Sequence, residues 1–485
     1  MSYNWFILAL GMLLLIYLGF RAKKIASSED EAGFLLGGRS FGPLVAAGTL
    51  MATGFSGWGF VGSPGAAYEY GFTEILANFF FAPAILIAIL FFSNHMRKRA
   101  MGLGSLTLPE YIAHQHNFSP GWSRTLQGLG GIVTVLMMIT LMIGQVRALG
   151  SITGQWLGIP EEYAAIMMVA IIIIYTATGG LAAVAWTDLI MVFGMSFAAI
   201  IVVTQIFGDT SLANIVSQLK AIDPELVNPP SGTPYGNFKA AAFLTLPWAF
   251  LWAAVVPYMG VRFLAFKETT KERDVALIGL PLGILLSLVP FVGVYVRSQG
   301  IMLDHPDDAM AVYLANYLPP LLAGIISLFI VFAMSSTANS VLHTMGSAAS
   351  NDIRKSMFFK RDVKGGTKVT IHRIGIIIFG LLAFIFYITS PPFFINFLAY
   401  LGTGTLQAML IGPVFVATFW RGNAAGALAS MVGGFLSCTL LLFLTDLGWV
   451  VAPLVADVIA VFLYVVVSLL TFKVMPRSEM ERVAS

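Results

Sequence analysis

One stretch of the sequence, residues 52–58, has the composition of an interrupted membrane helix. It reads Ala-Thr-Gly-Phe-Ser-Gly-Trp, and its two glycines permit backbone conformations that leave carbonyl oxygens unpaired. Such oxygens are hard ligands that suit a small cation, and in a bilayer they are tolerated only where they line a cavity. The alternative is a kink that does no more than allow close helix packing.

A second stretch places hydroxyl groups along one helix face. Four of them follow one another at spacings of 4, 4 and 3 residues: Ser336, Ser340, Thr344 and Ser347. Thr337 adds a hydroxyl next to Ser336, and the carbonyl of Ala333, one turn earlier, can turn outward. These groups could bind a cation, or they could bond only to their own helix and its neighbours, as membrane serines and threonines commonly do.

An acidic residue and two tryptophans are the other candidates for chemistry. Asp188 begins an otherwise apolar run, where burying a charge costs several kcal/mol, so it is either functional or the cap of a helix near the interface. Trp248 and Trp252 lie one helical turn apart next to Pro247. They could form the wall of an apolar solute pocket or simply pack against neighbouring helices.

The composition places all of these residues in a membrane protein. Of 485 residues, 58% are hydrophobic and 11% are charged, whereas roughly a quarter are charged in a soluble domain. The apolar residues form repeated runs of about twenty, the length of a bilayer-spanning helix. We expect an all-α polytopic membrane protein with thirteen transmembrane helices, at 3–20, 41–69, 72–96, 125–149, 162–178, 182–207, 238–264, 274–297, 310–350, 373–390, 393–419, 424–445 and 449–472.

The basic residues orient these helices, because cytoplasmic loops retain lysine and arginine. With the N-terminus outside, all but four of the 27 lysines and arginines fall toward the cytoplasm; the four are Arg147, Lys220, Lys239 and Arg297. Arg262 is counted here among the cytoplasmic cations. We therefore expect an outer N-terminus and a cytoplasmic C-terminus in the cell membrane.

Two of the expected helices are interrupted at corresponding positions. Helix 41–69 contains Gly54 and Gly57, and helix 238–264, five helices later, contains Pro257 and Gly260. Paired interruptions of this kind predict a five-plus-five inverted repeat with its binding site at the breaks. The expected organisation is an extra N-terminal helix and cytoplasmic loop at 1–40, a first repeat at 41–207, an extracytoplasmic loop at 208–237, a second repeat at 238–419, and two C-terminal helices with a short cytoplasmic tail at 420–485.

The loops contain no signature of enzyme chemistry. There is no phosphate-binding Gly-Lys-Ser/Thr run and no helical zinc pair, and Cys438 is the single cysteine. We expect a transporter rather than an enzyme, with a small-molecule solute and the lipid bilayer as partners, with no nucleic acid and no organic cofactor. A monomer should be sufficient for function.

At these residues the chain resembles the sodium:solute symporter family, which includes bacterial proline and pantothenate symporters and the sodium/glucose transporters. The resemblance spans nearly the whole length. It is carried by Phe-Leu-Leu-Gly-Gly-Arg-Ser at 34–40, Phe-Ser-Gly-Trp at 55–58, Gly-Ser-Pro-Gly-Ala-Ala-Tyr at 62–68, Gly-Gly-Leu at 179–181 with Trp-Thr-Asp at 186–188, and Ser336-Thr337 after Ala333.

The resemblance implies thirteen helices, an outer N-terminus and a sodium site. The sodium ligands would be the carbonyls of Ala52, Phe55 and Ala333 and the hydroxyls of Ser336 and Thr337. Asp188 would lie near the exit route of the ion, and Arg39 matches a family arginine that would shape the cytoplasmic gate. Gly54 stands where proline-type members have an aspartate, which argues against proline as the solute.

We therefore expect sodium-coupled import of a small organic solute by alternating access, with Na⁺ as the coupling ion. The candidate solute pocket consists of Gly54, Ser56, Trp58, Trp248 and Trp252. It would be small and apolar-walled, so we expect a monocarboxylate or a neutral amino acid rather than a cation or a sugar. The alternatives are a proton-coupled carrier of the same fold, a uniporter or channel-like protein, and a transporter-derived sensor.

Overall fold

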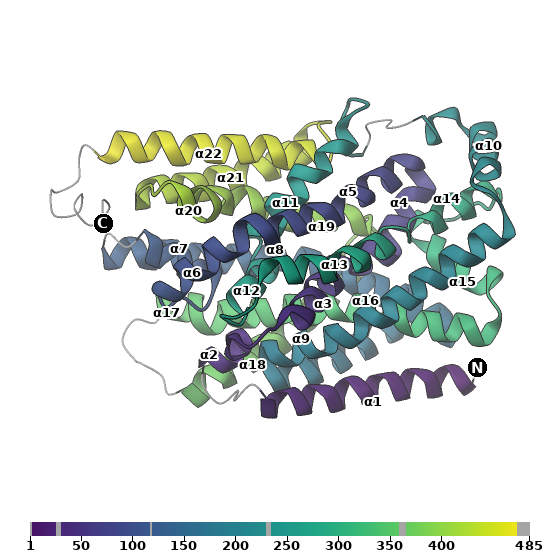
Figure 1. Cartoon of the computed structure of the whole chain (residues 1–485), viewed down its shortest axis with the longest axis horizontal. Helices are drawn as coiled ribbons and strands as arrows, with labels where there is room; N and C mark the ends of the chain where they lie inside the picture. Colours follow the sequence, from purple (N-terminus) through teal and green to yellow (C-terminus); the bar gives the residue numbers. More distant parts are fainter. Residues whose placement is uncertain (1, 26–30, 117–118, 229–233, 358–364, 473–485) are drawn as a thin grey trace.

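The computed structural model describes residues 2–25, 31–116, 119–228, 234–357 and 365–472. The cytoplasmic tail expected after Phe472 lies outside these residues, as do parts of the loops at 1–40 and 208–237. The described residues form helices joined by short loops, with one isolated β-bridge between Phe41 and Phe266. Most of the long helices run along the long axis of the molecule (Figure 1).

The helices of the first part of the chain are α1 (Ser2–Ile25), α2 (Glu31–Leu36), η1 (Gly37–Arg39), α3 (Pro43–Gly54), η2 (Trp58–Gly62), α4 (Ser63–Tyr70), α5 (Phe72–Ala88), η3 (Ile89–Ser93), α6 (Asn94–Gly102), α7 (Leu108–Gln115), α8 (Pro120–Leu157), α9 (Glu161–Asp209) and α10 (Leu212–Ile222). The short helix α10 lies inside the segment 208–237, which the sequence predicts to be an extracytoplasmic loop. It forms because Ile215 and Leu219 give it one apolar side, which is buried.

The helices of the second part are η4 (Pro224–Leu226), η5 (Ala241–Leu244), α11 (Thr245–Val255), α12 (Pro257–Leu264), α13 (Glu272–Leu286), α14 (Phe291–Ser298), η6 (Pro306–Asp308), α15 (Ala309–Tyr317), α16 (Pro320–Ser347), η7 (Ala348–Ile353), α17 (Arg354–Met357), α18 (Gly365–Thr389), α19 (Ile395–Leu410), η8 (Ile411–Val416), α20 (Ala417–Phe419), α21 (Ala424–Leu444) and α22 (Val451–Phe472). The single helix expected at 310–350 is divided into α15 and α16. Leu318 is extended there because Pro319 and Pro320 cannot continue a helix.

Both expected interruptions are confirmed. α3 and the η2–α4 segment meet at an angle of 50°, and α11 and α12 meet at 60°. The second bend occurs because Val256 precedes Pro257 and takes an extended conformation, with φ −73° and ψ 130°. The residues at both breaks, 54–57 and 255–257, are buried.

Ten described helices are long and apolar enough to cross a membrane, or up to twelve when each bent pair is taken as one span. The sequence predicts thirteen. The difference arises at α9, whose 49 residues are continuous except for a non-helical Gly180 with φ 60°. A Cβ at this position would clash with the carbonyl of Phe34, so the break requires glycine.

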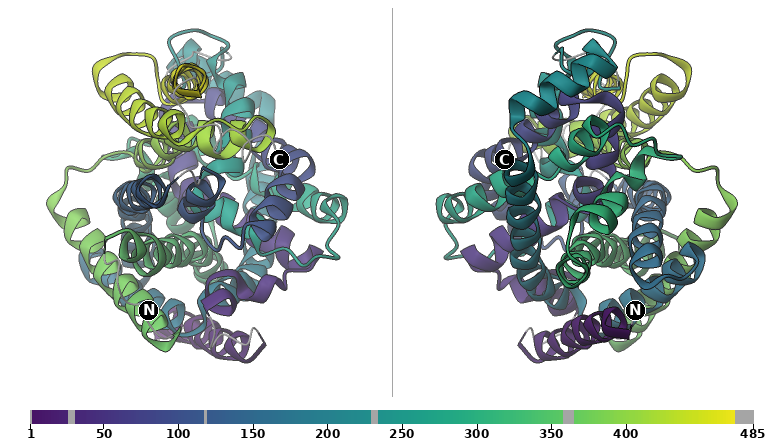
Figure 2. Two further views of the ribbon diagram at one scale, coloured as in Figure 1. Left: turned by 90° about the vertical axis from the view of Figure 1, so that its left-hand side faces the viewer. Right: turned by 90° about the vertical axis from the view of Figure 1, so that its right-hand side faces the viewer.

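The helices that carry the candidate site lie at the centre of the bundle. In the most apolar 18-residue stretch of each helix, 83% of the residues of Ile395–Phe419 and 67% of those of Pro320–Met357 are buried. The corresponding value is 28% for each of α1, α18, α21 and α22. The end-on views of Figure 2 place α1 and the α21–α22 pair at opposite edges. Figure 1 shows the start of α1 and the end of α22 at opposite ends of the long axis.

Candidate functional site

Side chains stabilise the break between α3 and η2. The chain leaves α3 at Phe55, with φ −94° and ψ 51°. The amide of Gly57 donates to Oε1 of Gln145 on α8 at 3.0 Å, and the amide of Trp58 donates to Oγ of Ser56 at 3.1 Å. A Cβ on Gly57 would lie 2.7 Å from the Gln145 oxygen, so this close approach requires glycine. The break is therefore a defined structure within the buried core.

The hydroxyls of α16 reach the carbonyls at the end of α3. Ser336 Oγ lies 2.9 Å from the carbonyl oxygen of Ala52 and 2.8 Å from that of Ala333. Thr337 Oγ1 donates to the carbonyl of Thr53 at 2.9 Å. All five residues are buried. Three of the candidate sodium ligands, Ser336, Ala52 and Ala333, are thus in direct contact. Thr337, the next residue on α16, makes the equivalent contact with Thr53, the next residue on α3.

This set of atoms fits a small monovalent cation. It consists of backbone carbonyls and hydroxyls, which are hard oxygen donors without formal charge. Phe55, the fifth candidate, lies at the same break. The hydroxyls of Ser336 and Thr337 donate to the carbonyls of Ala52 and Thr53, however, and not to the carbonyl of Phe55. A bound cation would require both hydroxyls to turn their protons away and present their oxygens.

Asp188 lies in a buried polar cluster beside these ligands. Its Oδ2 accepts hydrogen bonds from Thr49 Oγ1 at 2.6 Å and from Thr53 Oγ1 at 3.2 Å. It also forms an ion pair with Nη2 of Arg262 at 3.2 Å. Asp188 lies two turns beyond the break at Gly180, inside α9, and is fully buried. It is therefore not a helix cap at the membrane interface.

Arg262 corrects one assignment made from the sequence. The charge count places it among the cytoplasmic cations, although it falls inside the expected helix 238–264. In the structure it lies within α12 and its exposed fraction is 0%, so it is not a solvated cation. Its guanidinium donates to the hydroxyls of Thr49, Thr53 and Ser340 and to the carbonyl of Tyr258. The side chain can be buried here because Asp188 supplies the opposite charge and these oxygens accept its protons.

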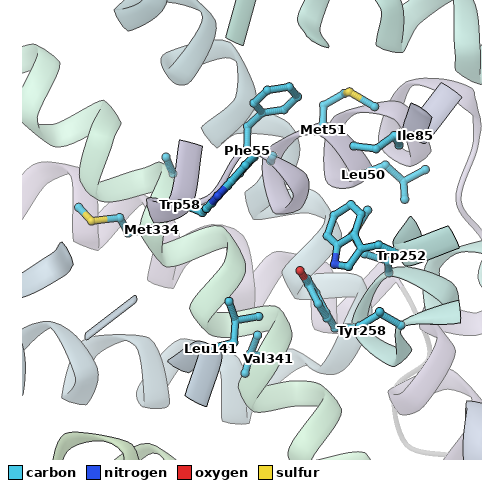
Figure 3. Packing of buried hydrophobic residues seen from close by; sticks show 14 of the residues in the cluster. Leu50, Met51, Phe55, Trp58, Ile85, Leu141, Trp252, Tyr258, Met334 and Val341 are labelled. Carbon is cyan, nitrogen blue, oxygen red and sulfur yellow. The ribbon is translucent and has the colours of Figure 1, made fainter. Parts of the chain in front are cut away.

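The five candidate solute residues line one cavity. Its described lining is Gly54, Ser56, Trp58, Phe81, Leu141, Trp248, Trp252, Tyr258, Ala399, Tyr400 and Thr403, none of which is acidic. The rings of Trp248 and Trp252 stack with centroids 6.2 Å apart. Figure 3 shows Trp252 beside Tyr258, whose ring centroids lie 6.0 Å apart. Six of the eleven lining residues are aromatic, so the wall of the cavity is largely apolar.

Two of the lining residues each carry a polar atom that has no hydrogen-bond partner among the described residues. These atoms are Nε1 of Trp248 and the hydroxyl of Tyr400, and both are buried. The two rings lie together, with centroids 4.6 Å apart. Buried donors are normally satisfied, so an acceptor on a bound solute would complete these two groups.

Arg39 joins three segments at the end of the bundle that contains α7. Its Nη1 donates to the carbonyl of Leu264 at the end of α12 at 3.3 Å, and its Nη2 donates to the carbonyl of Ser105 at 3.2 Å. Close by, the amide of Phe41 donates to the carbonyl of Ala265 at 3.1 Å. The segment before α3 is therefore tied to the end of α12.

Comparison with known proteins identifies the family. The model of the sodium:solute symporter family matches residues 34–434. The chain belongs to the sodium:solute symporter family. The sodium/pantothenate symporter of Escherichia coli (strain K12) is 27% identical over 418 residues, which cover 84% of each chain. The osmoregulated proline transporter of Bacillus subtilis (strain 168) is 24% identical over 461 residues, which cover 90% of this chain and 88% of that protein.

Solved structures of transporters share the fold of this family member. A sodium-coupled sialic acid symporter in a substrate-bound, outward-open state aligns with a TM-score of 0.76 at 17% identity, over 98% of both chains. A transporter of the nucleobase-cation-symport-1 family aligns with a TM-score of 0.54 at 15% identity, over 93% of this chain and 97% of that one. Together with the apolar helices, family membership identifies a multi-pass membrane transporter and supports sodium-coupled symport.

Two residues of the site were not predicted from the sequence of this symporter. They are Arg262, the buried partner of Asp188, and Tyr400 on α19, whose hydroxyl has no partner among the described residues. Arg262 had a usable signal, because an ionisable residue inside a membrane usually pairs with another and this arginine lies within an expected span. Tyr400 had none, since aromatic residues are common in membrane helices. Thr49 and Thr53 lie one turn apart on α3, so their hydroxyls share one face of the helix, a spacing that weakly indicates a polar contact.

Proposed function

We propose that this symporter imports a small organic solute together with sodium by alternating access. The observation that carries the proposal is the contact between Ser336 on α16 and the carbonyl of Ala52 at the break of α3. A sodium ion held by these oxygens, with those of Phe55, Ala333 and Thr337, would fasten the two helices together. It would thereby favour the state that accepts solute from outside.

The position of the cavity gives a physical reason for coupling. Gly54 and Ser56 line the cavity, and they belong to the same short break as the candidate sodium ligands Ala52 and Phe55. An ion that fixes the conformation of this break also fixes one wall of the solute site. Sodium and solute would each bind more tightly when the other is present, as reciprocal coupling requires.

The polar atoms of the cavity favour a monocarboxylate or a neutral amino acid as solute. The free donors of Trp248 and Tyr400 suit the oxygens of a carboxylate, and the aromatic wall suits a compact apolar body. A cation would find no acidic residue among the lining residues. A sugar would require more side-chain donors and acceptors than this lining provides.

The route to the cytoplasm is proposed to pass Asp188 and a gate at Arg39. A second cavity lies toward the α7 end of the bundle and is lined by Thr107, Val261, Thr344, Ser347 and Asp352, among others. The contacts of Arg39 with Leu264 and Ser105 hold together the segments around this end. Opening toward the cytoplasm would require these contacts to break.

The proposed topology has thirteen crossings, with the N-terminus outside and the C-terminus cytoplasmic. A helix of 49 residues spans roughly 73 Å at 1.5 Å per residue, whereas a bilayer core is about 30 Å thick. Counting α9 as two crossings separated at Gly180 raises twelve spans to thirteen. The five-plus-five repeat follows if the breaks at Gly54 and Val256 lie at equivalent positions.

Transport by purified protein in liposomes tests this proposal. Labelled proline, pantothenate, lactate, acetate, glucose and choline would be offered with an inward sodium gradient at equal pH, and then with a proton gradient in the absence of sodium. We expect sodium-driven accumulation of a carboxylate-bearing solute. Accumulation driven only by the proton gradient would identify a proton-coupled carrier, and exclusive uptake of glucose or choline would contradict the solute assignment.

A further inference from the structure

The cavity at the α7 end of the bundle has a polar lining that the proposed transport cycle does not explain. Its volume is about 20 Å³, enough for one water molecule or one unhydrated ion. The lining comes from the cap of α7, from α8, from the second half of α16 and from η7, and its polar members are Thr107, Thr134, His343, Thr344, Ser347 and Asp352. None of these residues belongs to the proposed sodium site or to the pair of Asp188 and Arg262.

Asp352 places a fully buried carboxyl group in this lining without a positive partner. Its Oδ1 accepts hydrogen bonds from neutral donors only: Thr107 Oγ1 at 2.7 Å, Gln127 Nε2 at 2.9 Å and Asn351 Nδ2 at 3.1 Å. Its Oδ2 has no partner among the described residues, and none of the ion pairs between described residues includes Asp352. A buried carboxylate in this situation is strongly destabilising unless a cation joins it.

The hydroxyls of α16 in this lining can act only as acceptors toward the cavity. Thr344 Oγ1 donates its proton to the carbonyl of Ser340 at 2.9 Å, and Ser347 Oγ donates its proton to the carbonyl of His343 at 2.8 Å. A hydroxyl has one proton, so both oxygens have only lone pairs left to offer. Their protons already point away, as a bound cation requires.

His343 adds a further acceptor, and Thr134 adds a free hydroxyl. Nε2 of His343 lies 3.4 Å from the carbonyl of Leu35. A carbonyl only accepts, so Nε2 carries the proton and Nδ1, which has no partner among the described residues, presents a lone pair. Thr134 Oγ1 on α8 also has no partner in the described part of the chain.

This surplus of acceptors indicates a cation rather than water. A water molecule could donate to two of these atoms, but it would leave the charge of Asp352 uncompensated. Carboxylate and hydroxyl oxygens are hard ligands, which suit a small hard cation. The volume of the cavity admits one such ion without its hydration shell.

We propose that this cavity binds a sodium ion from the cytoplasm, held by Asp352, Thr134, Thr344 and Ser347, and that the ion holds the cytoplasmic end of the symporter closed. Its ligands would join α8, α16 and η7 beneath α12, whose Pro257 and Val261 cover the same cavity. This ion would not be carried with the solute. High cytoplasmic sodium would therefore slow the carrier from the side on which sodium is released.

The inference rests on the proposed topology and sodium coupling, and counting bound ²²Na⁺ distinguishes the two statements. The count is made on purified protein and requires no solute. We expect two sodium ions per chain for the unaltered protein, one for Ser336→Ala/Thr337→Ala, whose proposed transport site is weakened, and none when Asp352→Asn is added to that pair. Glu110→Gln is the matched control, because Glu110 is a buried carboxylate at the same end that pairs with Lys355 at 2.7 Å. Added to the same pair, it should leave one ion bound.

Each other count contradicts a defined statement. An unaltered protein that binds no sodium would contradict the proposed function as well as this inference. One ion in the unaltered protein and none in Ser336→Ala/Thr337→Ala would contradict the inference alone. A count that Asp352→Asn leaves unchanged would show that Asp352 does not hold the ion.

Thr134→Val provides a test that leaves the buried carboxyl group in place. It keeps the shape of the side chain and removes a hydroxyl that has no partner among the described residues. In the Ser336→Ala/Thr337→Ala background we expect about tenfold weaker ²²Na⁺ binding. Thr140→Val, on the same helix, removes a hydroxyl that donates to the carbonyl of Met137 at 2.7 Å and should leave the affinity unchanged. Equal affinities in the two variants would overturn the proposed ligand set.

The effect on the cytoplasmic end can be measured by thiol labelling. In the Ser336→Ala/Thr337→Ala background, sodium should slow the modification of Val261→Cys about tenfold, whereas the same concentration of potassium is the control for ionic strength. Asp352→Asn should abolish the effect of sodium. If sodium binds according to the ²²Na⁺ count but does not slow labelling, the ion does not hold this end closed.

Discussion

Ser336 Oγ and the carbonyl oxygen of Ala52 lie 2.9 Å apart, although 284 positions separate the two residues in the sequence. This contact joins the hydroxyl-bearing face of α16 to the break that follows α3. Both atoms are hard oxygen donors, and both are buried. A change in their separation would alter the proposed sodium site and the adjacent wall of the cavity together.

Removal of either hydroxyl ligand should weaken sodium binding. We expect Ser336→Ala and Thr337→Ala each to raise the sodium concentration for half-maximal thermal stabilisation about tenfold, since a lost ligand of hydrogen-bond strength is worth on the order of 1.4 kcal/mol. Ser335→Ala is the matched control, because the hydroxyl of Ser335 on the same helix has no partner among the described residues. Unchanged sodium titrations for both variants would show that the ligands were wrongly assigned.

Asp188→Asn should both destabilise the protein and weaken sodium binding. It leaves the buried guanidinium of Arg262 without its opposite charge, which costs about 3–5 kcal/mol in the free energy of unfolding. Asp457→Asn is a suitable control, because Asp457 is buried but pairs with the neutral amide of Gln407 at 2.6 Å. Equal losses of thermal stability in the two variants would argue against a special role for the ion pair.

The free donors of the cavity should determine affinity for a carboxylate. Trp248→Phe and Tyr400→Phe each retain an aromatic ring but remove one donor, so we expect about tenfold weaker competition by lactate, acetate, proline or pantothenate, whichever is transported. Trp252→Phe is the control, since it reduces the bulk of the same wall and leaves both free donors in place. Weaker competition only in Trp252→Phe would indicate that shape, and not hydrogen bonding, selects the solute.

Arg39 should restrict access from the cytoplasm. In a Val261→Cys background, Arg39→Ala should increase the rate of modification by a thiol reagent on the α7 side about tenfold, because the two hydrogen bonds from Arg39 to Leu264 and Ser105 are lost. Arg99→Ala is the control, since Arg99 lies at the same end but bonds to the carbonyl of Thr418 at 2.9 Å. Equal rates of thiol modification in Arg39→Ala and the parent protein would show that Arg39 is not part of the gate.

Two glycines allow the orientation to be tested. Gly208 and Gly102 are exposed, and a Cβ at either would meet open space. The natural Cys438 is buried, so the parent protein should remain unlabelled. In intact cells an impermeant thiol reagent should label Gly208→Cys, and it should label Gly102→Cys only after permeabilisation. The reverse pattern would invert the proposed topology.

Local signals account for the parts of the site that the sequence predicts. Glycine and proline act within a few residues of their own position, so the interruptions near Gly54 and Pro257 can be located without the fold. The spacing of Ser336 and Ser340 likewise fixes their common face, because a helix has a known period. The five candidate solute residues line one cavity because the two broken helices meet there.

The parts that the sequence does not predict depend on contacts between distant helices. The position of Arg262 inside an expected span signals a buried partner, but only the approach of α9 identifies Asp188 as that partner. Tyr400 reaches the cavity from α19, far along the chain. The helix predicted at 310–350 also differs from the structure, because the two prolines at 319 and 320 divide this apolar run into α15 and α16.

The opposite charges of Asp188 and Arg262 also determine how the membrane potential acts on the carrier. The buried pair sums to zero and the proposed sodium ligands are neutral, so the unloaded site moves no net charge as it reorients. Sodium with a neutral amino acid adds one positive charge, and moving that charge through 100 mV is worth about 2.3 kcal/mol. A monocarboxylate would cancel it. With one sodium ion per solute, voltage would therefore drive uptake of a neutral amino acid, whereas uptake of a monocarboxylate would be electrically silent.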